Sequence, residues 1–235
     1  MSNPIYYITH ENIKDKNILE DFIYSNNDLN YYFSDSFCAD FYIDLALAGF
    51  ISVWYKEDDT QFILPEIQFE YAVLDFQDLH ISKKVKKLLK KGDKDYSFIV
   101  DDRFDDILEN LKSYHENSWI KGKYIELLKD LDKDSHKTDK FKLSYAAVVC
   151  NNTKKIIAGE IGYITHNSIY TSLTGFCSKD KAYNNYGTLQ LVLLAKYLEK
   201  ENFSFWNLGH PHMEYKLKLG AKVLNRREFL DRFLK

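Results

Sequence analysis

The last hundred residues contain the feature that most constrains the fold, a series of short apolar runs separated by polar turns. Six elements follow one another in the order strand, strand, strand, helix, strand, helix, with predicted bounds of 143–150, 156–164, 169–176, 186–200, 203–208 and 213–219. Turns of a few residues join the first three strands, which predicts an antiparallel meander. The last helix ends at Gly220, and a strand and a short helix follow it. The pattern predicts a mixed sheet with helices packed on it.

The residues before this series predict a smaller unit of helices and short strands. The predicted elements are helices at 11–25, 39–48, 82–91, 103–115 and 119–131, and strands at 50–55, 61–64, 70–75 and 96–100. The polar run at 130–140 is predicted to be a solvated loop. We expect an N-terminal α+β domain of residues 1–100, which contains a lysine-rich helix, and a C-terminal domain of residues 101–235.

The order of the C-terminal elements is that of the GNAT-type acyltransferase fold. In that fold two adjacent central strands splay apart, and the acyl carrier enters the gap between them. The ending YKLKLGAKVLNRREF resembles the closing helix and strand of such domains, where a glycine ends the helix. The expected fold class is therefore α/β (α+β), with a GNAT-like acyltransferase C-terminal domain built on a mixed sheet. Fold alone does not name the substrate.

Composition places the chain among ordinary globular proteins. Of its 235 residues, 45% are hydrophobic and 29% are charged, and no segment reaches the roughly 20 apolar residues of a membrane span. The first residues lack the basic start and apolar run of a signal peptide, so we expect a cytoplasmic protein with no membrane partner. Cys38, Cys150 and Cys177 are odd in number and widely spaced, which predicts neither a disulfide framework nor a zinc site.

One helix is strongly basic although the net charge of the chain is −3. Six lysines occur within residues 83–91, while Val85, Leu88 and Leu89 form an apolar stripe on one face. Such a helix is either a solvated surface helix or a site for the phosphates of a nucleic acid.

Five segments, spread over nearly the whole chain, carry a resemblance to a known family. They read FYIDLALAGF at 41–50, YAVLDFQDLHISKKVKKLLKK at 71–91, SWI at 118–120, AGEIGY at 158–163, and LGA with RREF at 219–229. In their order and spacing they resemble the leucyl/phenylalanyl-tRNA–protein transferases, which move an apolar amino acid from aminoacyl-tRNA to the N-terminus of a protein.

The resemblance implies the substrates and the residues that bind the donor. Aminoacyl-tRNA is the implied co-substrate, with no other cofactor and no metal, and the acceptor is a protein or peptide N-terminus. We expect a monomer. The implied tRNA contacts are Lys83, Lys86, Lys87 and Lys90, because acceptor-stem phosphates need cationic side chains. Trp119 matches the family's position for contact with the terminal adenosine or the aminoacyl group, whereas Trp54 is expected to lie in the core.

The residues that should perform the chemistry depart from the family pattern. The segment SLTGF at 172–176 occurs where the family has a Gly-Glu-Ser-Met-Phe-type segment, so Leu173 takes the place of the glutamate. With a shift of one residue, Asn207 takes the place of the aspartate in the family's Asp-Cys-Gln segment. The Pro-Asp-Pro-Arg stretch of the family reads QFEY here. We expect Leu173, Thr174 and Phe176 to bind the substrate in this altered pocket.

Replacement catalytic groups are predicted near the strand at 203–208. Aminolysis of an activated ester needs an amine, a proton acceptor and a polarised carbonyl. The candidates are Asn207, His210 and Glu214, and His210 is among them because an imidazole accepts a proton near neutral pH. The alternative for the GHPH segment is a turn with exposed histidines, and no third ligand completes a metal site with His212. A thioester at Cys177 is a further alternative to an inert thiol.

The sequence leaves three functions open. The first is an aminoacyl-tRNA-dependent transferase with an altered donor or acceptor. The second is a GNAT-type N-acyltransferase that uses acyl-CoA, although NNYGT at 184–188 offers a single glycine for a pyrophosphate cradle. The third is a non-catalytic descendant that binds tRNA or peptide, which the missing carboxylates favour.

Overall fold

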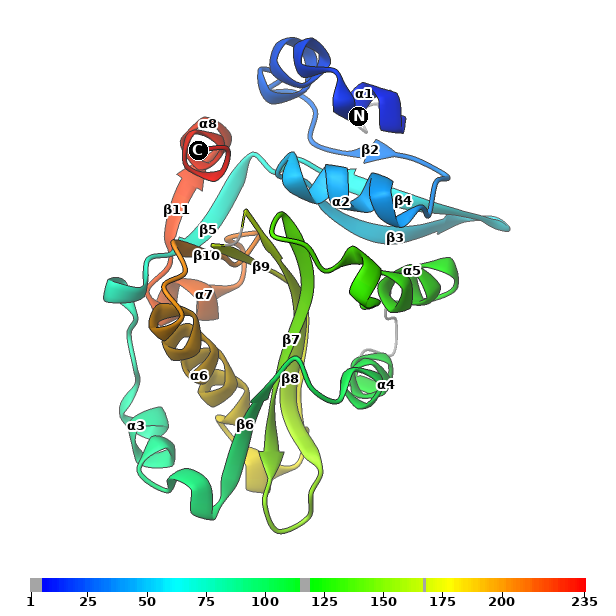
Figure 1. Cartoon of the computed structure of the whole chain (residues 1–235). Coiled ribbons are helices and arrows are strands. Elements are labelled where there is room, and N and C mark those ends of the chain that lie inside the picture. The colour runs from blue at the N-terminus through cyan, green and yellow to red at the C-terminus, as the bar shows by residue number, and fades with distance from the viewer. Residues whose placement is uncertain (1–5, 115–118, 167) are drawn as a thin grey trace.

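A mixed sheet forms the centre of the computed structural model, which describes residues 6–114, 119–166 and 168–235 (Figure 1). Its strands are β5 (Glu70–Leu74), β6 (Tyr96–Val100), β7 (Phe141–Cys150), β8 (Ile156–Thr165), β9 (Ile169–Cys177), β10 (Phe205–Asn207) and β11 (Lys222–Asn225). They lie in the order β11-β5-β10-β9-β8-β7-β6. Neighbouring strands are antiparallel except β9 and β10, which are parallel.

The strands β7, β8 and β9 form the predicted antiparallel meander. Nearly every residue of β7 and β8 is buried, which is the burial expected when helices cover both faces of a sheet. After β9 the chain forms helix α6 (Tyr186–Lys200), returns as β10, and forms α7 (Glu214–Leu219), which ends at Gly220 with a φ of +111°. This order confirms the predicted mixed α/β fold with a GNAT-like series of elements.

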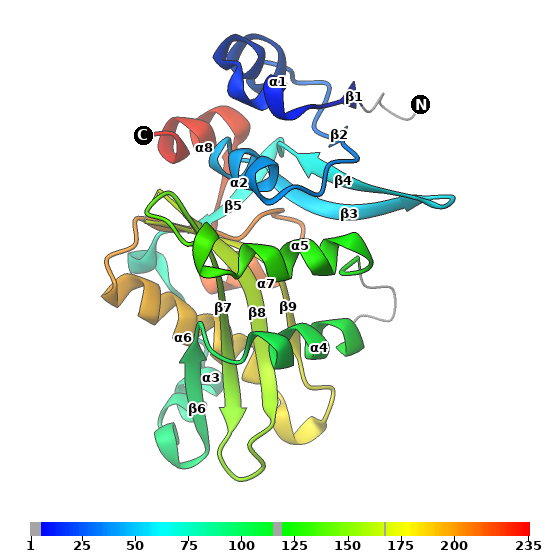
Figure 2. The same cartoon turned by 45° about the vertical axis from the view of Figure 1, so that its right-hand side comes forward.

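Helices pack on both faces of the sheet (Figures 1 and 2). On one face, α6 buries Leu189 and Val192, and α3 (Lys83–Leu89) packs beside it through Val85. On the other face lie α4 (Phe104–Tyr114) and α5 (Lys123–Leu131), which share one apolar cluster with β7 and β8. The central sheet is therefore a middle layer, with α3 and α6 on one face and α4 and α5 on the other.

The first residues form a smaller layer next to the β5 end of the sheet (Figure 1). Its elements are β1 (Tyr6–Tyr7), α1 (His10–Lys14), the π-helix η1 (Ile18–Tyr24), β2 (Tyr32–Phe33), α2 (Ala39–Leu47), and the hairpin β3 (Ile51–Glu57) and β4 (Thr60–Glu66). The expectation of one helix over 11–25 is wrong. Asp15 has an extended backbone and accepts hydrogen bonds from the N–H groups of Asn17 and Ile18, so α1 ends there and η1 begins separately.

The remaining elements are short or close the chain. In the described part of the chain, 3₁₀ turns occur at Phe76–Asp78, Gly92–Lys94, Asp134–His136 and Lys181–Tyr183. The last helix is α8 (Arg226–Phe233). Among the described residues, none of the helices combines the length and the hydropathy that a membrane span requires.

Arg226, at the first turn of α8, joins the N-terminal layer to the sheet. It is 4% exposed, and its guanidinium donates hydrogen bonds to main-chain carbonyls while it lies 4.7 Å from the ring centroid of Phe69. The accepting carbonyls are those of Ile23, Asn26, Leu29, Ile67 and Gln68.

The division into domains of residues 1–100 and 101–235 stays a prediction. Two strands from the first hundred residues, β5 and β6, pair with strands of the second part within the central sheet. A boundary at residue 100 therefore passes through that sheet.

Candidate functional site

The parallel strands β9 and β10 pair over a short length and then separate. Pairing joins Ile169, Tyr170 and Thr171 of β9 to the three residues of β10. The strand β9 continues to Cys177 without this partner, and a cavity of about 640 Å³ opens beside its second half. The cavity lies where the GNAT-like order of elements predicts a gap between strands. Its lining residues are Tyr114, Trp119, Gly159, Glu160, Ser172 to Cys177, Gly187, Thr188, Gln190, Leu191, Leu208, Met213, Tyr215 and Lys216.

Glu160, on β8, is a buried carboxylate in the wall of this cavity. It is 3% exposed, and its Oε1 accepts a hydrogen bond of 2.8 Å from Ser172 Oγ. Trp206 Nε1 donates to the same Ser172 oxygen at 2.9 Å, which orients the serine hydroxyl toward the carboxylate. Gln190 Nε2 lies 3.5 Å from Oε2. Burial raises the pKa of Glu160 to about 7, and the hydrogen bond from Ser172 opposes part of this effect.

Local strand geometry makes room for Glu160. Its partner in the β8–β9 register is Gly175, and a Cβ built there would meet the Glu160 Cβ at 3.3 Å. The next two residues of β8, Ile161 and Gly162, pair with Thr174 and Ser172, so Leu173 is the extra residue of a β-bulge. Leu173 and the residues of β9 that follow it line the cavity.

Lys216, on α7, is the second buried ionisable residue of the cavity. It is 6% exposed, and its Nζ donates to the carbonyl oxygens of Leu208 and of His210, the latter at 2.7 Å. Burial lowers the pKa of Lys216 to about 8, while the carboxylate of Glu160 acts in the opposite direction. An ammonium group has three N–H donors, so one remains after the two carbonyls are bound.

The predicted substrate-binding residues are brought together at the cavity. Leu173, Thr174 and Phe176 line it from β9, and Trp119 lines it from the segment before α5. The Trp119 ring packs edge-to-face on Tyr124, with 5.2 Å between ring centroids. Ser118, the first residue of the family-like tripeptide, lies outside the described residues. Trp54 is on β3 and donates from Nε1 to Gln61 Oε1 at 3.0 Å, away from the cavity lining.

The three predicted catalytic residues lie elsewhere. None of them is among the described residues that line the cavity. Asn207 is 1% exposed and accepts a hydrogen bond from the N–H of Gly209. His210 lies 2.8 Å from Glu66, measured from Nε2 to Oε2, and Glu214 forms an exposed ion pair with Lys218. Their catalytic role stays a prediction, and each of these side chains has a structural partner instead of a place in the cavity.

Sequence reasoning missed Glu160 and Lys216. A signal existed for Glu160, since it is a lone carboxylate in the apolar run IIAGEIGYI, and a buried carboxylate needs partners. Lys216 carries no comparable signal, because it alternates with Lys218 in a short helix whose buried face cannot be assigned from the sequence. Among the described residues, no group of three or more His, Cys, Asp or Glu side chains is placed to hold a metal ion.

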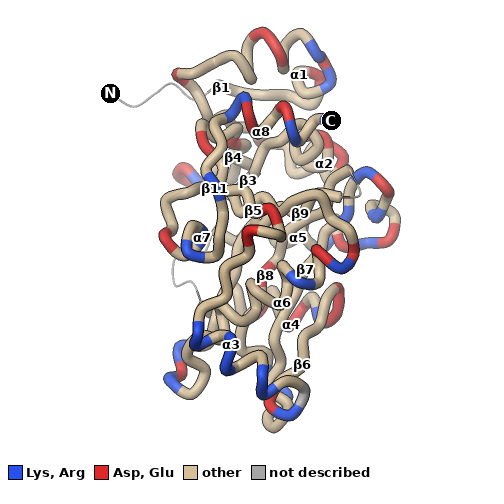
Figure 3. Tube along the Cα trace, turned by 90° about the vertical axis from the view of Figure 1, so that its left-hand side faces the viewer, with Lys and Arg blue, Asp and Glu red and all other residues tan. Residues whose placement is uncertain are grey.

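The lysine-rich helix α3 lies on the outside of α6 (Figure 3). Ser82 caps it by accepting a hydrogen bond from the N–H of Val85, and Val85 is fully buried against α6. The predicted tRNA contacts, Lys83, Lys86, Lys87 and Lys90, are all exposed. Whether they bind tRNA stays a prediction.

The end of the basic segment lies close to the start of α6. Tyr96 is the first residue of β6, seven residues after the end of α3. Its ring packs edge-to-face on Tyr186, with 6.1 Å between ring centroids. Tyr186 is the first residue of α6, and the next two, Gly187 and Thr188, line the cavity. The chain that follows the basic helix and the cavity thus both adjoin the first turn of α6.

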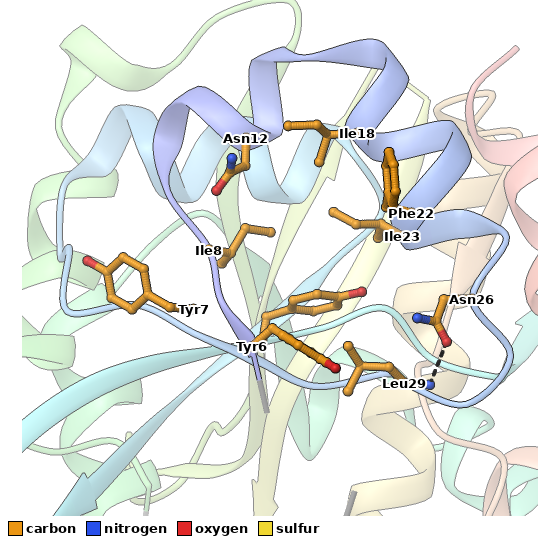
Figure 4. A pocket seen from close by; sticks show the side chains of 10 residues that line it. Tyr6, Tyr7, Ile8, Asn12, Ile18, Phe22, Ile23, Asn26 and Leu29 are labelled. Carbon is orange, nitrogen blue, oxygen red and sulfur yellow. Dashed lines mark hydrogen bonds between the residues drawn. The ribbon is translucent and has the colours of Figure 1, made fainter. Parts of the chain in front are cut away.

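A second cavity, of about 420 Å³, lies in the N-terminal layer (Figure 4). Its walls are mostly aliphatic and aromatic, with Ile8, Ile18, Phe22, Ile23 and Leu29 among the lining residues. Asn12 and Asn26 are its amide side chains, and it has no carboxylate, lysine or histidine among its described lining residues. It offers no proton acceptor for acyl transfer, so the cavity at β9 is the candidate active site.

A mixed sheet of this order, with two parallel strands that separate beside a cavity, is a GNAT-like acyltransferase fold. The family model of the leucyl/phenylalanyl-tRNA protein transferases matches residues 73–234, and the chain belongs to this family. A search of curated protein sequences gives no match.

Several solved structures are similar to the chain at low sequence identity. The C-terminal domain of a putative lysylphosphatidylglycerol synthetase from Agrobacterium fabrum is 15% identical over 77% of this chain and 61% of its own, with a TM-score of 0.43. L-PGS from Bacillus licheniformis is 11% identical over 94% of this chain and 69% of its own, with a TM-score of 0.47. A GCN5-related N-acetyltransferase-like protein from Streptococcus suis is 14% identical over 66% and 57%, with a TM-score of 0.39. The fold described above rests on the strand order and register of the chain itself.

Proposed function

We propose that the protein transfers an apolar amino acid from aminoacyl-tRNA to an amine, such as the N-terminus of a protein or peptide. The observation that carries this proposal is the presence of two buried ionisable residues, Glu160 and Lys216, in the lining of one cavity beside diverging parallel strands. The family to which the chain belongs supports the identity of the donor. The cavity supplies chemical groups where the family's own carboxylates are missing.

In this proposal Glu160 is the proton acceptor. Transfer requires the acceptor amine to attack the ester carbonyl of the donor, to lose a proton and to release the 3′-terminal hydroxyl of the tRNA. A carboxylate with a pKa near 7 is ionised in part at neutral pH, and it is a better base there than an ordinary glutamate. The hydroxyl of Ser172 keeps the carboxylate oriented.

Lys216 is placed to stabilise negative charge. Two of its N–H groups donate to the carbonyls of Leu208 and His210, and the third can donate to the substrate. This donor and the positive charge stabilise the oxyanion that develops on the ester carbonyl. The effect is large because a buried cation is poorly screened by water.

The walls of the cavity fit the donor's other parts. Leu173, Phe176 and Leu208 offer an apolar surface to an apolar side chain, and Trp119 offers a ring on which the terminal adenosine stacks. The exposed lysines of α3 provide positive charge for the acceptor-stem phosphates, across the first turn of α6.

The proposal is tested by incubating the purified protein with labelled aminoacyl-tRNAs and peptides that differ in their N-terminal residue. We expect label to move into peptide, with apolar amino acids the best donors, and the variants Glu160→Gln and Lys216→Met to lose most of the activity. His212→Phe, a change in an exposed residue outside the cavity lining, is the control. Transfer from acyl-CoA without tRNA contradicts the proposal, and label that stays on bound tRNA supports a non-catalytic descendant.

A further inference from the structure

A buried carboxylate of the N-terminal layer touches the loop that holds Lys216. Glu66, the last residue of β4, is 5% exposed, and its Oε2 lies 2.8 Å from His210 Nε2. Its other oxygen, Oε1, accepts a hydrogen bond of 2.7 Å from Asn30 Nδ2. The family match begins at residue 73, so Glu66 lies outside it.

The loop from Leu208 to His210 presents two carbonyl oxygens to the Lys216 ammonium. Its first half is fixed by the sheet, because Leu208 N–H donates to the carbonyl of Ala72 and Ala72 N–H donates to the carbonyl of Gly209. Gly209 has a φ of +72°, which lets the chain turn so that the carbonyls of Leu208 and His210 both reach Nζ. His210, at the end of the loop, lies beyond the pairing of β10 with β5, and its ring contacts Glu66.

We propose that Glu66 and His210 are a positioning pair that fixes Lys216 in the cavity. The proposal rests on the catalytic role of Lys216 given above, and it assigns a role in the reaction to the N-terminal layer. If the His210 ring loses its carboxylate partner, the His210 carbonyl is free to turn, and the ammonium loses one of its two acceptors. A buried ammonium that loses an acceptor moves toward water, and the cavity then lacks its cation.

The same contacts separate this role from catalysis by His210 itself. The His210 ring is absent from the described lining of the cavity, and its Nε2 is engaged with Glu66. A histidine that acts on the substrate would need its ring at the reacting atoms. A positioning histidine needs only the contact with Glu66, and a side-chain amide can replace that contact.

The test uses three variants of the full chain and two measurements. His210→Phe removes the contact with Glu66, His210→Gln keeps an N–H donor near the position of Nε2, and His212→Phe changes the stacked neighbour, whose ring centroid is 5.3 Å away. The first measurement is the rate of reductive methylation of Lys216 by peptide mass spectrometry, with exposed Lys84 in the same samples as internal reference. The second is kcat and KM for transfer from aminoacyl-tRNA to peptide.

In His210→Phe we expect Lys216 to be methylated about tenfold faster and kcat to fall about tenfold, the change that corresponds to one lost hydrogen bond to a charged group. KM for the donor should stay within about twofold, since the tRNA contacts are untouched. His210→Gln and His212→Phe should resemble the wild type in both measurements.

Two results would overturn the proposal. One is unchanged methylation of Lys216 in His210→Phe, and the other is a loss of kcat in His210→Gln as large as that in His210→Phe, which indicates catalysis by the imidazole. If the wild type shows no transferase activity but Lys216 is methylated faster in His210→Phe, the result supports the positioning pair and rejects the proposed function. A thermal melt of each variant identifies any change caused by unfolding.

Discussion

Glu160 and Lys216 line the same cavity, and each residue counteracts the effect of burial on the other. Burial raises the pKa of the Glu160 carboxyl to about 7, and the Lys216 ammonium lowers it in part. Burial lowers the pKa of Lys216 to about 8, and the Glu160 carboxylate raises it in part. Both groups therefore change protonation close to neutral pH, which is where an acid and a base for aminolysis are useful.

The first prediction is a bell-shaped pH dependence of transfer. Glu160 must be ionised to accept a proton, so kcat/KM should rise through about pH 7, and Lys216 must be protonated to bind an oxyanion, so kcat/KM should fall above about pH 8. The measurement is the rate of label transfer from aminoacyl-tRNA to peptide over about pH 5 to 10. Glu160→Gln should lower the rate by about 10²-fold or more and remove the acid limb. An acid limb that persists in this variant contradicts the assignment.

The second prediction concerns the free energy of unfolding. The folded-state pKa of Glu160 is raised, so the folded protein binds a proton more tightly than the unfolded chain does. The contribution of Glu160 to the free energy of unfolding should therefore be fully present below about pH 4.5 and be lost as the pH rises to about 7, by up to about 3 kcal/mol. Glu160→Gln should be more stable than the wild type at pH above about 7, and the difference should vanish below about 4.5. Urea unfolding at several pH values measures this, with exposed Glu214→Gln as control.

The third prediction compares two adjacent arginines. Arg226→Met leaves several buried carbonyl groups without a donor, so it should destabilise the fold by more than about 3 kcal/mol. Arg227→Met should change stability by less than about 0.5 kcal/mol, because Arg227 is exposed and its ion pair is with exposed Asp231. Urea unfolding of both variants measures the two changes in the free energy of unfolding. Equal changes would contradict the claim that Arg226 joins the N-terminal layer to the sheet.

The fourth prediction tests the basic helix. Lys86→Glu combined with Lys87→Glu should weaken tRNA binding at least about tenfold and reduce the slope of log affinity against log salt concentration by about 2. Lys196→Glu combined with Lys200→Glu, a matched reversal of two exposed lysines on α6, should have a much smaller effect. Filter binding or fluorescence anisotropy over a range of salt concentrations measures both. Equal losses in the two double variants would show that net charge, and not α3, determines affinity.

The elements whose ends are marked by local chemistry could be predicted from the sequence. The helix α6 was expected at 186–200 and occupies Tyr186–Lys200, since a loop rich in polar residues precedes a long apolar periodicity. The helix α3 begins after Ser82 because a serine caps it. The meander β7–β9 follows from apolar runs joined by short turns. In each case residues close in sequence determine the structure.

Features that depend on distant residues could not be predicted in this way. The position of β5 between β10 and β11 joins residues 132 to 155 positions apart, and no local pattern encodes that pairing. The cavity residues show the same limit. Trp119, Leu173, Thr174 and Phe176 were found because the family resemblance names their positions, whereas Glu160 and Lys216 meet only because the sheet and α7 bring them to one place.

The place of β5 in the sheet has a consequence for how the chain is made. A ribosome synthesises β5 well before its two neighbours, since β10 begins at Phe205 and β11 at Lys222. Both edges of β5 therefore stay unpaired while the more than one hundred residues between β5 and β10 are made, and a strand with free edges is a site for aggregation. A truncation before β11 removes one of the two strands that cover the edges of β5.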